Sequence, residues 1–254
     1  MAPDTFLIVT AYNEADRIAA TLDALAGAFP GAPVLVADDG STDATAAIAA
    51  AAGAEVHGTG RMLGKGEAAT RGARAALDRA GAEGVAQSAV FVLCDGDLGA
   101  SAARLVALRD AVARGEADVA VAAFARRVGG GLGLALGFAR WSIRRRCGLA
   151  TRAPISGQRA LSAQALADAL PFAHGFGMEV GMTIDVVRAG HRLTEIELEL
   201  EHRASGRTLA GFAHRGGQLL DFARVYLARG ALARALRGGG PGRARGEIRA
   251  RGRE

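Results

Sequence analysis

Short apolar runs alternate with amphipathic stretches along the first half of the chain. The runs 34–37 and 90–94 are continuously apolar, and 6–11 is apolar except for Thr10, which is typical of strands buried on both faces of a parallel sheet. Between the first two runs, Ile18 and Leu22 begin a series of apolar residues at helical spacing. Strands and helices that alternate with short connections form βαβ units. The sequence therefore predicts an α/β domain with a mostly parallel sheet.

The remaining elements follow from the same patterns. The further predicted helices cover 43–52, 67–80, a stretch from 178 to 189, and one or two helices in 209–236; the further predicted strands cover 54–57, 119–124 and 193–200. Asn13 is expected to cap the first helix, and Ser41 or Thr42 the second, because their side-chain oxygens can accept backbone N–H groups. We expect one domain in 1–207, a helical extension in 208–237, and a disordered basic tail in 238–254.

Two carboxylates, Asp95 and Asp97, lie at the end of the apolar run 90–94. Ligands of open α/β sheets bind outside the carboxyl ends of the strands. A pair of acids there suits a hard divalent cation that also binds phosphate oxygens, although Asp-Gly-Asp is also common in turns. A second pair, Asp38 and Asp39, ends another predicted strand. It could hydrogen-bond a base or ribose, or cap a helix.

A glycine-rich segment, 58–66, precedes the predicted helix 67–80. Glycines let the backbone approach an anion closely, and a helix N-terminus attracts phosphate. Lys65 would add positive charge to this segment. The segment is not a Walker A loop, because Gly-Lys is followed by Gly-Glu. The first strand leads into Tyr-Asn-Glu at 12–14 rather than a G-x-G-x-x-G turn, so a dinucleotide-binding start is also excluded.

Composition and charge indicate where the protein is located and which partners it could bind. The 254 residues carry a net charge of +5, and half of them are hydrophobic. No uninterrupted apolar run approaches the roughly 20 residues of a membrane span, and the start lacks the basic residues of a signal peptide. Two cysteines provide no disulfide framework, so we expect a cytoplasmic protein. The arginine-rich tail could meet an anionic partner, but we expect no nucleic-acid partner.

Four consecutive segments carry a specific resemblance. They are Ile-Val-Thr-Ala-Tyr-Asn-Glu at 8–14, Ala-Asp-Asp-Gly-Ser-Thr-Asp at 37–43, Gly-Lys-Gly-Glu-Ala at 64–68, and Leu-Cys-Asp-Gly-Asp-Leu at 93–98. In order and spacing, they resemble GT-A glycosyltransferases of family 2. The chain is similar both to the dolichyl- or polyprenyl-phosphate sugar transferases and to the glucosyl-3-phosphoglycerate synthase family. The resemblance implies a Rossmann-like three-layer α/β/α fold and transfer of a hexose from a nucleotide diphosphate sugar.

The resemblance also implies roles for individual residues. The donor would be bound by Thr10, Glu14, Asp38, Asp39, Lys65, Asp95, Arg203 and Arg207. Among these, Asp39 would lie at the nucleobase, and the two arginines would contact the diphosphate. The metal ligands would be Asp95 and Asp97 of the D-x-D motif together with His202, holding Mg²⁺ or Mn²⁺. The catalytic residues would be Lys65, Asp97 and Glu179, which stands where both families place an acid near the sugar or acceptor.

The acceptor is indicated by the second half of the chain. Residues 155–160 resemble the Thr-Ser-Gly-Phe-Arg segment of the polyprenyl-phosphate enzymes, but the Glu-Asp pair that supplies a general base in many inverting members is missing. A hydroxyl acceptor needs such a base, whereas an ionised phosphate does not. We therefore expect a phosphorylated acceptor, or a retaining mechanism that uses no such base.

The stretch 132–146 decides between lipid and small acceptors. It combines apolar residues, Trp141 and the arginines 144–146, a composition that suits an anionic membrane surface but also a packed helix with a solvated arginine face. This stretch and the basic C-terminal region favour polyprenyl phosphate, with peripheral contact at the inner face of the membrane. The alternatives are a small phosphate acceptor such as phosphoglycerate, a nucleotidyltransferase, and a sugar-nucleotide-binding protein without catalysis.

Overall fold

A seven-stranded sheet forms the centre of the molecule, with strand order β3-β2-β1-β4-β6-β5-β7. The computed structural model describes residues 4–124, 134–201 and 220–230. Its strands are β1 (Thr5–Ala11), β2 (Val34–Asp38), β3 (Glu55–Gly58), β4 (Val90–Asp95), β5 (Val119–Phe124), β6 (Arg159–Ser162) and β7 (Leu193–Leu198). Strand β6 is antiparallel to both neighbours, and every other pairing is parallel. The predicted mostly parallel α/β sheet is confirmed.

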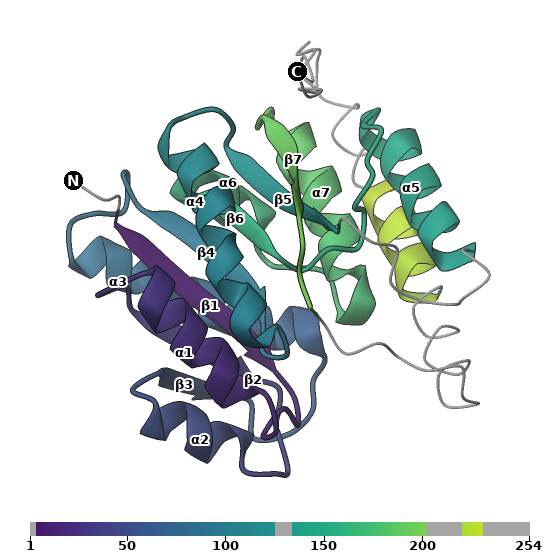
Figure 1. Cartoon of the computed structure of the whole chain (residues 1–254). Coiled ribbons are helices and arrows are strands. Elements are labelled where there is room, and N and C mark those ends of the chain that lie inside the picture. The colour runs from purple at the N-terminus through teal and green to yellow at the C-terminus, as the bar shows by residue number, and fades with distance from the viewer. Residues whose placement is uncertain (1–3, 125–133, 202–219, 231–254) are drawn as a thin grey trace.

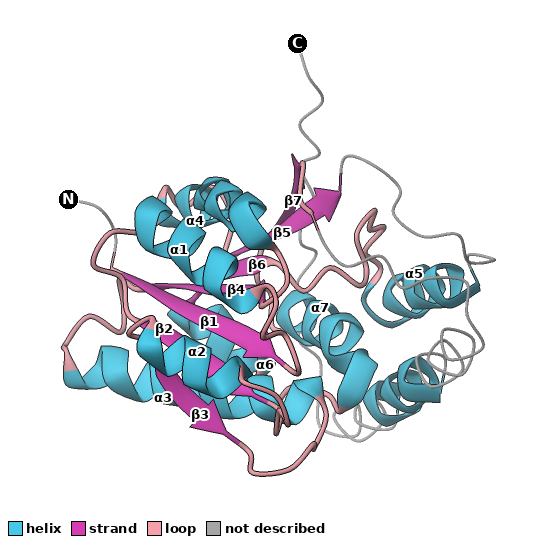
Figure 2. Cartoon of the chain, turned by 60° about the horizontal axis from the view of Figure 1, so that its bottom comes forward, coloured by secondary structure: helices cyan, strands magenta, loops and turns pink. Residues whose placement is uncertain are grey.

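Helices cover both faces of the sheet (Figures 1 and 2). They are α1 (Ile18–Ala28), α2 (Thr45–Ala51), α3 (Lys65–Ala82), the 3₁₀ helix η1 (Gly99–Leu105), α4 (Val106–Ala113), α5 (Leu134–Cys147), α6 (Ala163–Ala169), the short 3₁₀ helix η2 (Gly175–Gly177) and α7 (Met178–Arg188). The core on one face joins the sheet to α1, α2, η1 and α4, and the core on the other joins it to α3, α6 and α7. This arrangement is the predicted three-layer α/β/α fold.

Strand β1 shows why the central runs lack the alternation of polar and apolar residues. Leu7 and Val9 pack into the core under α1, whereas Phe6 and Ile8 pack into the core under α3. Successive side chains of a strand point to opposite faces, so a strand covered on both sides needs apolar residues throughout. The Phe6 ring stacks on Phe91 of β4, with 5.3 Å between the ring centroids.

The predicted helix caps are wrong. Helix α1 begins at Ile18, four residues after the Asn-Glu break, and has no side-chain cap. Asn13 instead adopts a left-handed conformation (φ 55°) and links two loops. Its N–H donates to Ser41 Oγ, and its side-chain oxygen accepts the N–H of Thr42. The polar side chains expected at the helix starts therefore hold the β1–α1 and β2–α2 loops together at the edge of the sheet.

The second half adds an element that the apolar pattern did not predict. Strand β6 lies between β4 and β5, and it brings the segment before it beside the carboxyl end of β4. Residues 220–230 are helical and pack with α5 and α7 around Ile143, Ile184, Phe222 and Val225. Most of the predicted extension 208–237 and all of the predicted tail 238–254 lie outside the described residues. Within the described residues, no helix is long and apolar enough to span a membrane.

Helix α3 must begin close to the loop before η2, and Gly66 makes this possible. A Cβ on Gly66 would overlap the carbonyl oxygen of Ala173. We expect Gly66→Ala to destabilise the fold by about 1–3 kcal/mol, because backbone cannot yield as a side chain can. Gly81→Ala, in the same helix and with no atom near its Cβ, should stabilise by up to about 1 kcal/mol. Urea unfolding of both variants measures this, and equal effects would contradict the packing argument.

Candidate active site

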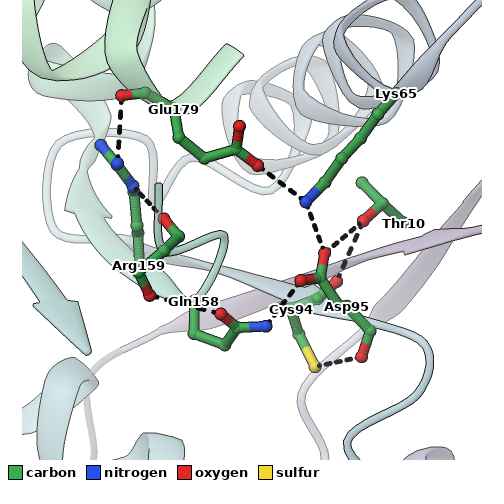
Figure 3. Close-up of polar contacts among 8 residues, drawn as sticks. Thr10, Lys65, Cys94, Asp95, Gln158, Arg159 and Glu179 are labelled. Atoms are coloured by element: carbon green, nitrogen blue, oxygen red, sulfur yellow. Dashed lines mark hydrogen bonds and ion pairs between the residues drawn. The ribbon is translucent and has the colours of Figure 1, made fainter. Parts of the chain in front are cut away.

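The candidate site lies at the carboxyl ends of β1 and β4, where Thr10 and Asp95 are register partners. The Thr10 hydroxyl donates to Asp95 Oδ1 over 3.0 Å. Figure 3 shows that Lys65 of α3 and Gln158 of the segment before β6 both contact this Asp95 carboxylate, and that Glu179 of α7 contacts the Lys65 ammonium. Several residues that were predicted from separate motifs therefore meet at one edge of the sheet, as the rule for open α/β folds requires.

Lys65 links the two acids of the site. As the first residue of α3, it places Nζ 2.7 Å from Asp95 Oδ1 and 2.8 Å from Oε1 of Glu179, in the first turn of α7. Burial by itself would lower the pKa of Lys65, but the charges of Asp95 and Glu179 outweigh it and raise that pKa above the ordinary value. Lys65 is therefore a permanent cation in the site.

The Asp95 carboxylate accepts hydrogen bonds from three directions. Besides Thr10 and Lys65, Gln158 Nε2 donates to Asp95 Oδ2 over 2.7 Å. Burial by itself would raise the pKa of Asp95, yet the Lys65 charge and these hydrogen bonds hold it below the ordinary value. Gly157 permits this close approach, because a Cβ there would lie 2.8 Å from both Asp95 Oδ2 and Lys65 Nζ.

Arg159 is buried completely beside this cluster. Its guanidinium donates to the carbonyl of Ser156 (2.9 Å), the carbonyl of Glu179 (3.1 Å) and Thr183 Oγ1 (2.9 Å). Burial lowers the pKa of Arg159 to about 10, which leaves it protonated at neutral pH. Arg159 therefore fixes its own segment, 155–160, against the first turn of α7, which carries Glu179.

The loop before segment 155–160 is bound by Glu195, a residue of β7. The Glu195 carboxylate accepts the N–H groups of Arg152 (3.0 Å) and Ala153 (3.0 Å) and the hydroxyl of Thr151. Burial alone would raise the pKa of Glu195, but these hydrogen bonds lower it. Residues 151–153, which lie just before segment 155–160, are thus fixed to β7 through one carboxylate.

The acids predicted to bind the nucleotide also shape the loops around the site. The Asp39 carboxylate accepts the N–H of Leu63 (2.8 Å) and of Gly64 (2.9 Å), which orders the loop leading to Lys65. Asp38 accepts the N–H and hydroxyl of Ser41. Their contact with a nucleobase or ribose stays a prediction, as does the role of Glu14 toward the nucleotide.

Two of the three predicted metal ligands, Asp95 and Asp97, are described by the structure, and their carboxylates suit a hard divalent cation. Asp97 follows Asp95 in the turn after β4, and carboxylate oxygens are the ligands that Mg²⁺ and Mn²⁺ prefer. Asp95 already accepts three hydrogen-bonding side chains, two of them on Oδ1 and one on Oδ2, so Oδ2 has the lone pair that a cation could still use. Within the described ranges, no group of three or more His, Cys, Asp or Glu side chains could hold a metal. The third predicted ligand, His202, and the predicted diphosphate ligands Arg203 and Arg207 lie outside these ranges.

Sequence reasoning assigned no role to Gln158 or Arg159. Both stand in segment 155–160, Ile-Ser-Gly-Gln-Arg-Ala. The resemblance of this segment to a family motif is the signal that could have indicated a role for them. Their partners, Asp95 and Glu179, lie 63 and 20 residues away, so no local pattern could identify them.

The chain matches Glycosyl transferase family 2 over residues 6–154. Solved structures of similar fold include glucosyl-3-phosphoglycerate synthase from Mycobacterium tuberculosis with Mn²⁺, UDP-glucose and phosphoglyceric acid: 25% identity and a TM-score of 0.68 over 89% of this chain and 79% of that one. The same enzyme with Mg²⁺ and UDP gives 26% identity and a TM-score of 0.68 over 89% and 79%. No curated protein matches the chain.

We expect Asp95→Asn to change the pH dependence of stability. Because the pKa of Asp95 is lowered in the folded state, its carboxylate contributes stability that is complete above the unfolded value of about 3.9. That contribution is lost as the pH falls through the folded value. Unfolding free energies of the wild type and Asp95→Asn should therefore diverge as the pH rises from acid toward about 5. Asp23→Asn, at an exposed position of α1, is the control, and a difference independent of pH would contradict the prediction.

Proposed function

The chain belongs to Glycosyl transferase family 2, and from that premise we propose that it transfers a hexose from a nucleotide diphosphate sugar to a phosphorylated acceptor with the help of Mg²⁺ or Mn²⁺. Family membership favours sugar transfer over nucleotidyl transfer and over binding without catalysis. The glucosyl-3-phosphoglycerate synthase structures that contain Mn²⁺, UDP-glucose and phosphoglyceric acid support the donor, cation and acceptor classes.

The Lys65 position carries the proposal. A permanent cation beside Asp95, at the carboxyl end of β4, can offset the charge that develops on a leaving diphosphate. Glu179 fixes the ammonium from the other side, so Lys65 is oriented before the donor arrives. Asp97, together with Asp95, would hold the Mg²⁺ or Mn²⁺ ion. When bound, this metal ion would act as a Lewis acid and stabilise the same diphosphate.

The donor assignment is tested with the nucleotide and cation that the similar structures contain. UDP-glucose with Mn²⁺ should raise the melting temperature of the wild type, because a ligand of the native state stabilises it by mass action. Asp97→Ala should abolish this shift and reduce transfer by on the order of 100-fold or more, and added Mg²⁺ should not restore either. Asp78→Ala, at an exposed position near the opposite end of α3 from Lys65, serves as the control. Near-wild-type turnover of Asp97→Ala would contradict the assignment.

A small phosphate is the acceptor that the comparisons support. The similar structures contain phosphoglyceric acid, and one contains glycerol 3-phosphate. Segment 155–160 contains neither a carboxylate nor a histidine, so it offers no general base to a hydroxyl acceptor. A phosphate oxygen needs none, because it is ionised near neutral pH. Transfer to the hydroxyl of phosphoglyceric acid would instead require the retaining mechanism that uses no such base.

Polyprenyl phosphate is a second candidate, which the surface of α5 favours. The side chain of Trp141 is 48% exposed, Arg144 and Arg145 are exposed, and α5 contains no acidic residue. Arg146 does not belong to this surface, because its guanidinium lies 3.6 Å from the Tyr226 ring centroid in the helix 220–230. The proposed lipid-contacting surface of α5 therefore includes Arg144 and Arg145 but not Arg146.

One experiment separates the two acceptors. If the acceptor is a lipid, the protein should bind vesicles with anionic lipid at low salt and release them as salt rises, since each exposed arginine contributes on the order of 1 kcal/mol. The double variant Arg144→Glu/Arg145→Glu should then bind less and slow transfer to polyprenyl phosphate. Arg71→Glu/Arg114→Glu, at exposed positions elsewhere, is the charge-matched control. Full-rate transfer to 3-phosphoglycerate without vesicle binding would reject the lipid acceptor.

A further inference from the structure

One buried hydroxyl of α1 holds the turn that carries Asp97. Thr21 Oγ1 donates to the carbonyl of Gly96 over 2.8 Å. Thr21 Oγ1 also accepts the N–H of Gly99 over 2.9 Å. Thr21 has no exposed surface, so water cannot replace these hydrogen bonds. Its 3.3 Å contact with the carbonyl of Arg17 is longer, and the single hydroxyl proton serves the shorter contact.

The same turn is held at two further points. The N–H of Gly96 donates to the carbonyl of Thr10 over 2.9 Å, which ties the turn to β1. Arg17 Nη1 donates to the carbonyl of Asp97 over 3.0 Å, which is a second contact from α1. The backbone on both sides of Asp97 is therefore fixed, and Thr21 holds both ends of this short segment.

The hydroxyl of Thr21 has no packing function that a methyl group would not fulfil. Position 21 lies on the buried face of α1, next to Leu22 and near Ile18 and Leu25. A buried hydroxyl costs free energy unless it is hydrogen-bonded, and valine has nearly the same shape. The Thr21 hydroxyl satisfies two backbone groups of the turn, which explains why threonine rather than valine stands at this position.

We propose that Thr21 is a positioning residue for the reaction: its hydroxyl fixes Gly96 and Gly99 and thereby sets where the Asp97 carboxylate meets the cation and diphosphate of the donor. The inference rests on the proposed function. A small divalent cation demands nearly ideal ligand geometry, and misplacement by about 1 Å can cost on the order of 100-fold in rate. A relaxed turn would therefore weaken metal–nucleotide binding even where the fold persists.

Three substitutions separate the hydroxyl from the shape of the side chain. Thr21→Val keeps the shape and removes the hydroxyl. Thr21→Ser and Thr21→Ala both lack the methyl group and differ from each other mainly in the hydroxyl. Thr70→Val is the matched control, because Thr70 is also a buried helical threonine whose hydroxyl accepts a distant N–H, that of Phe172 over 3.0 Å.

The readouts are the affinity for Mn²⁺ with UDP, from the electron paramagnetic resonance signal of free Mn²⁺, the melting temperature, and amide hydrogen exchange at 96–99. We expect Thr21→Val and Thr21→Ala to weaken Mn²⁺–UDP binding at least about tenfold, or about 1.4 kcal/mol, and to speed exchange at Gly99. Thr21→Ser should stay within about threefold of the wild type. Thr70→Val should lower the melting temperature but keep the affinity.

Unchanged affinity in both Thr21→Val and Thr21→Ala would overturn the inference, as would equal losses in Thr21→Ser and Thr21→Ala. Failure of Thr21→Val to fold would leave the serine–alanine pair to decide. If the wild type bound no Mn²⁺–UDP, the proposed function would fall. Amide exchange at Gly99 would then still decide whether Thr21 fixes the turn.

Discussion

The charge balance of Lys65, Asp95 and Glu179 is the constraint on which the rest of the site depends. Removing one partner of a partly buried ion pair leaves an uncompensated charge, which is strongly destabilising. The start of α3, the end of β4 and the start of α7 must therefore meet within hydrogen-bonding distance of one ammonium group. Lys65 thus joins elements whose acids lie 30 and 114 residues away in the sequence.

The backbone around this cluster is built for close approach. Gly66 lets α3 begin against the loop before η2, and Gly157 lets the segment before β6 lie against the ion pair. Arg159, at the start of β6, then joins that segment to α7. The antiparallel strand β6 thus brings a segment from the second half of the chain to the donor motifs of the first half.

The molecule divides the proposed reaction between its two halves. Motifs at the ends of β1, β2 and β4 supply the predicted donor and cation ligands, and two of their carboxylates, Asp38 and Asp39, also order neighbouring loops. Segment 155–160, which includes the start of β6, comes from the second half of the chain. The helix 220–230 packs on α5 through Tyr226, whose ring lies 4.8 Å from that of Trp141, so the face of α5 that would meet a lipid is also partly braced by packing.

The sequence by itself determined the layered α/β fold, most strands, and the family, because continuous apolar runs report burial and the acidic pair after β4 belongs to a specific series of motifs. It also identified Lys65, Asp95 and Glu179 individually. Only the tertiary structure decided that these three form one cluster, that Gln158 and Arg159 complete it, and that Asn13 joins loops rather than capping α1. Local periodicity records which face is buried, whereas contacts between distant segments depend on strand order. The insertion of β6 between β4 and β5 is the step that no local pattern contains.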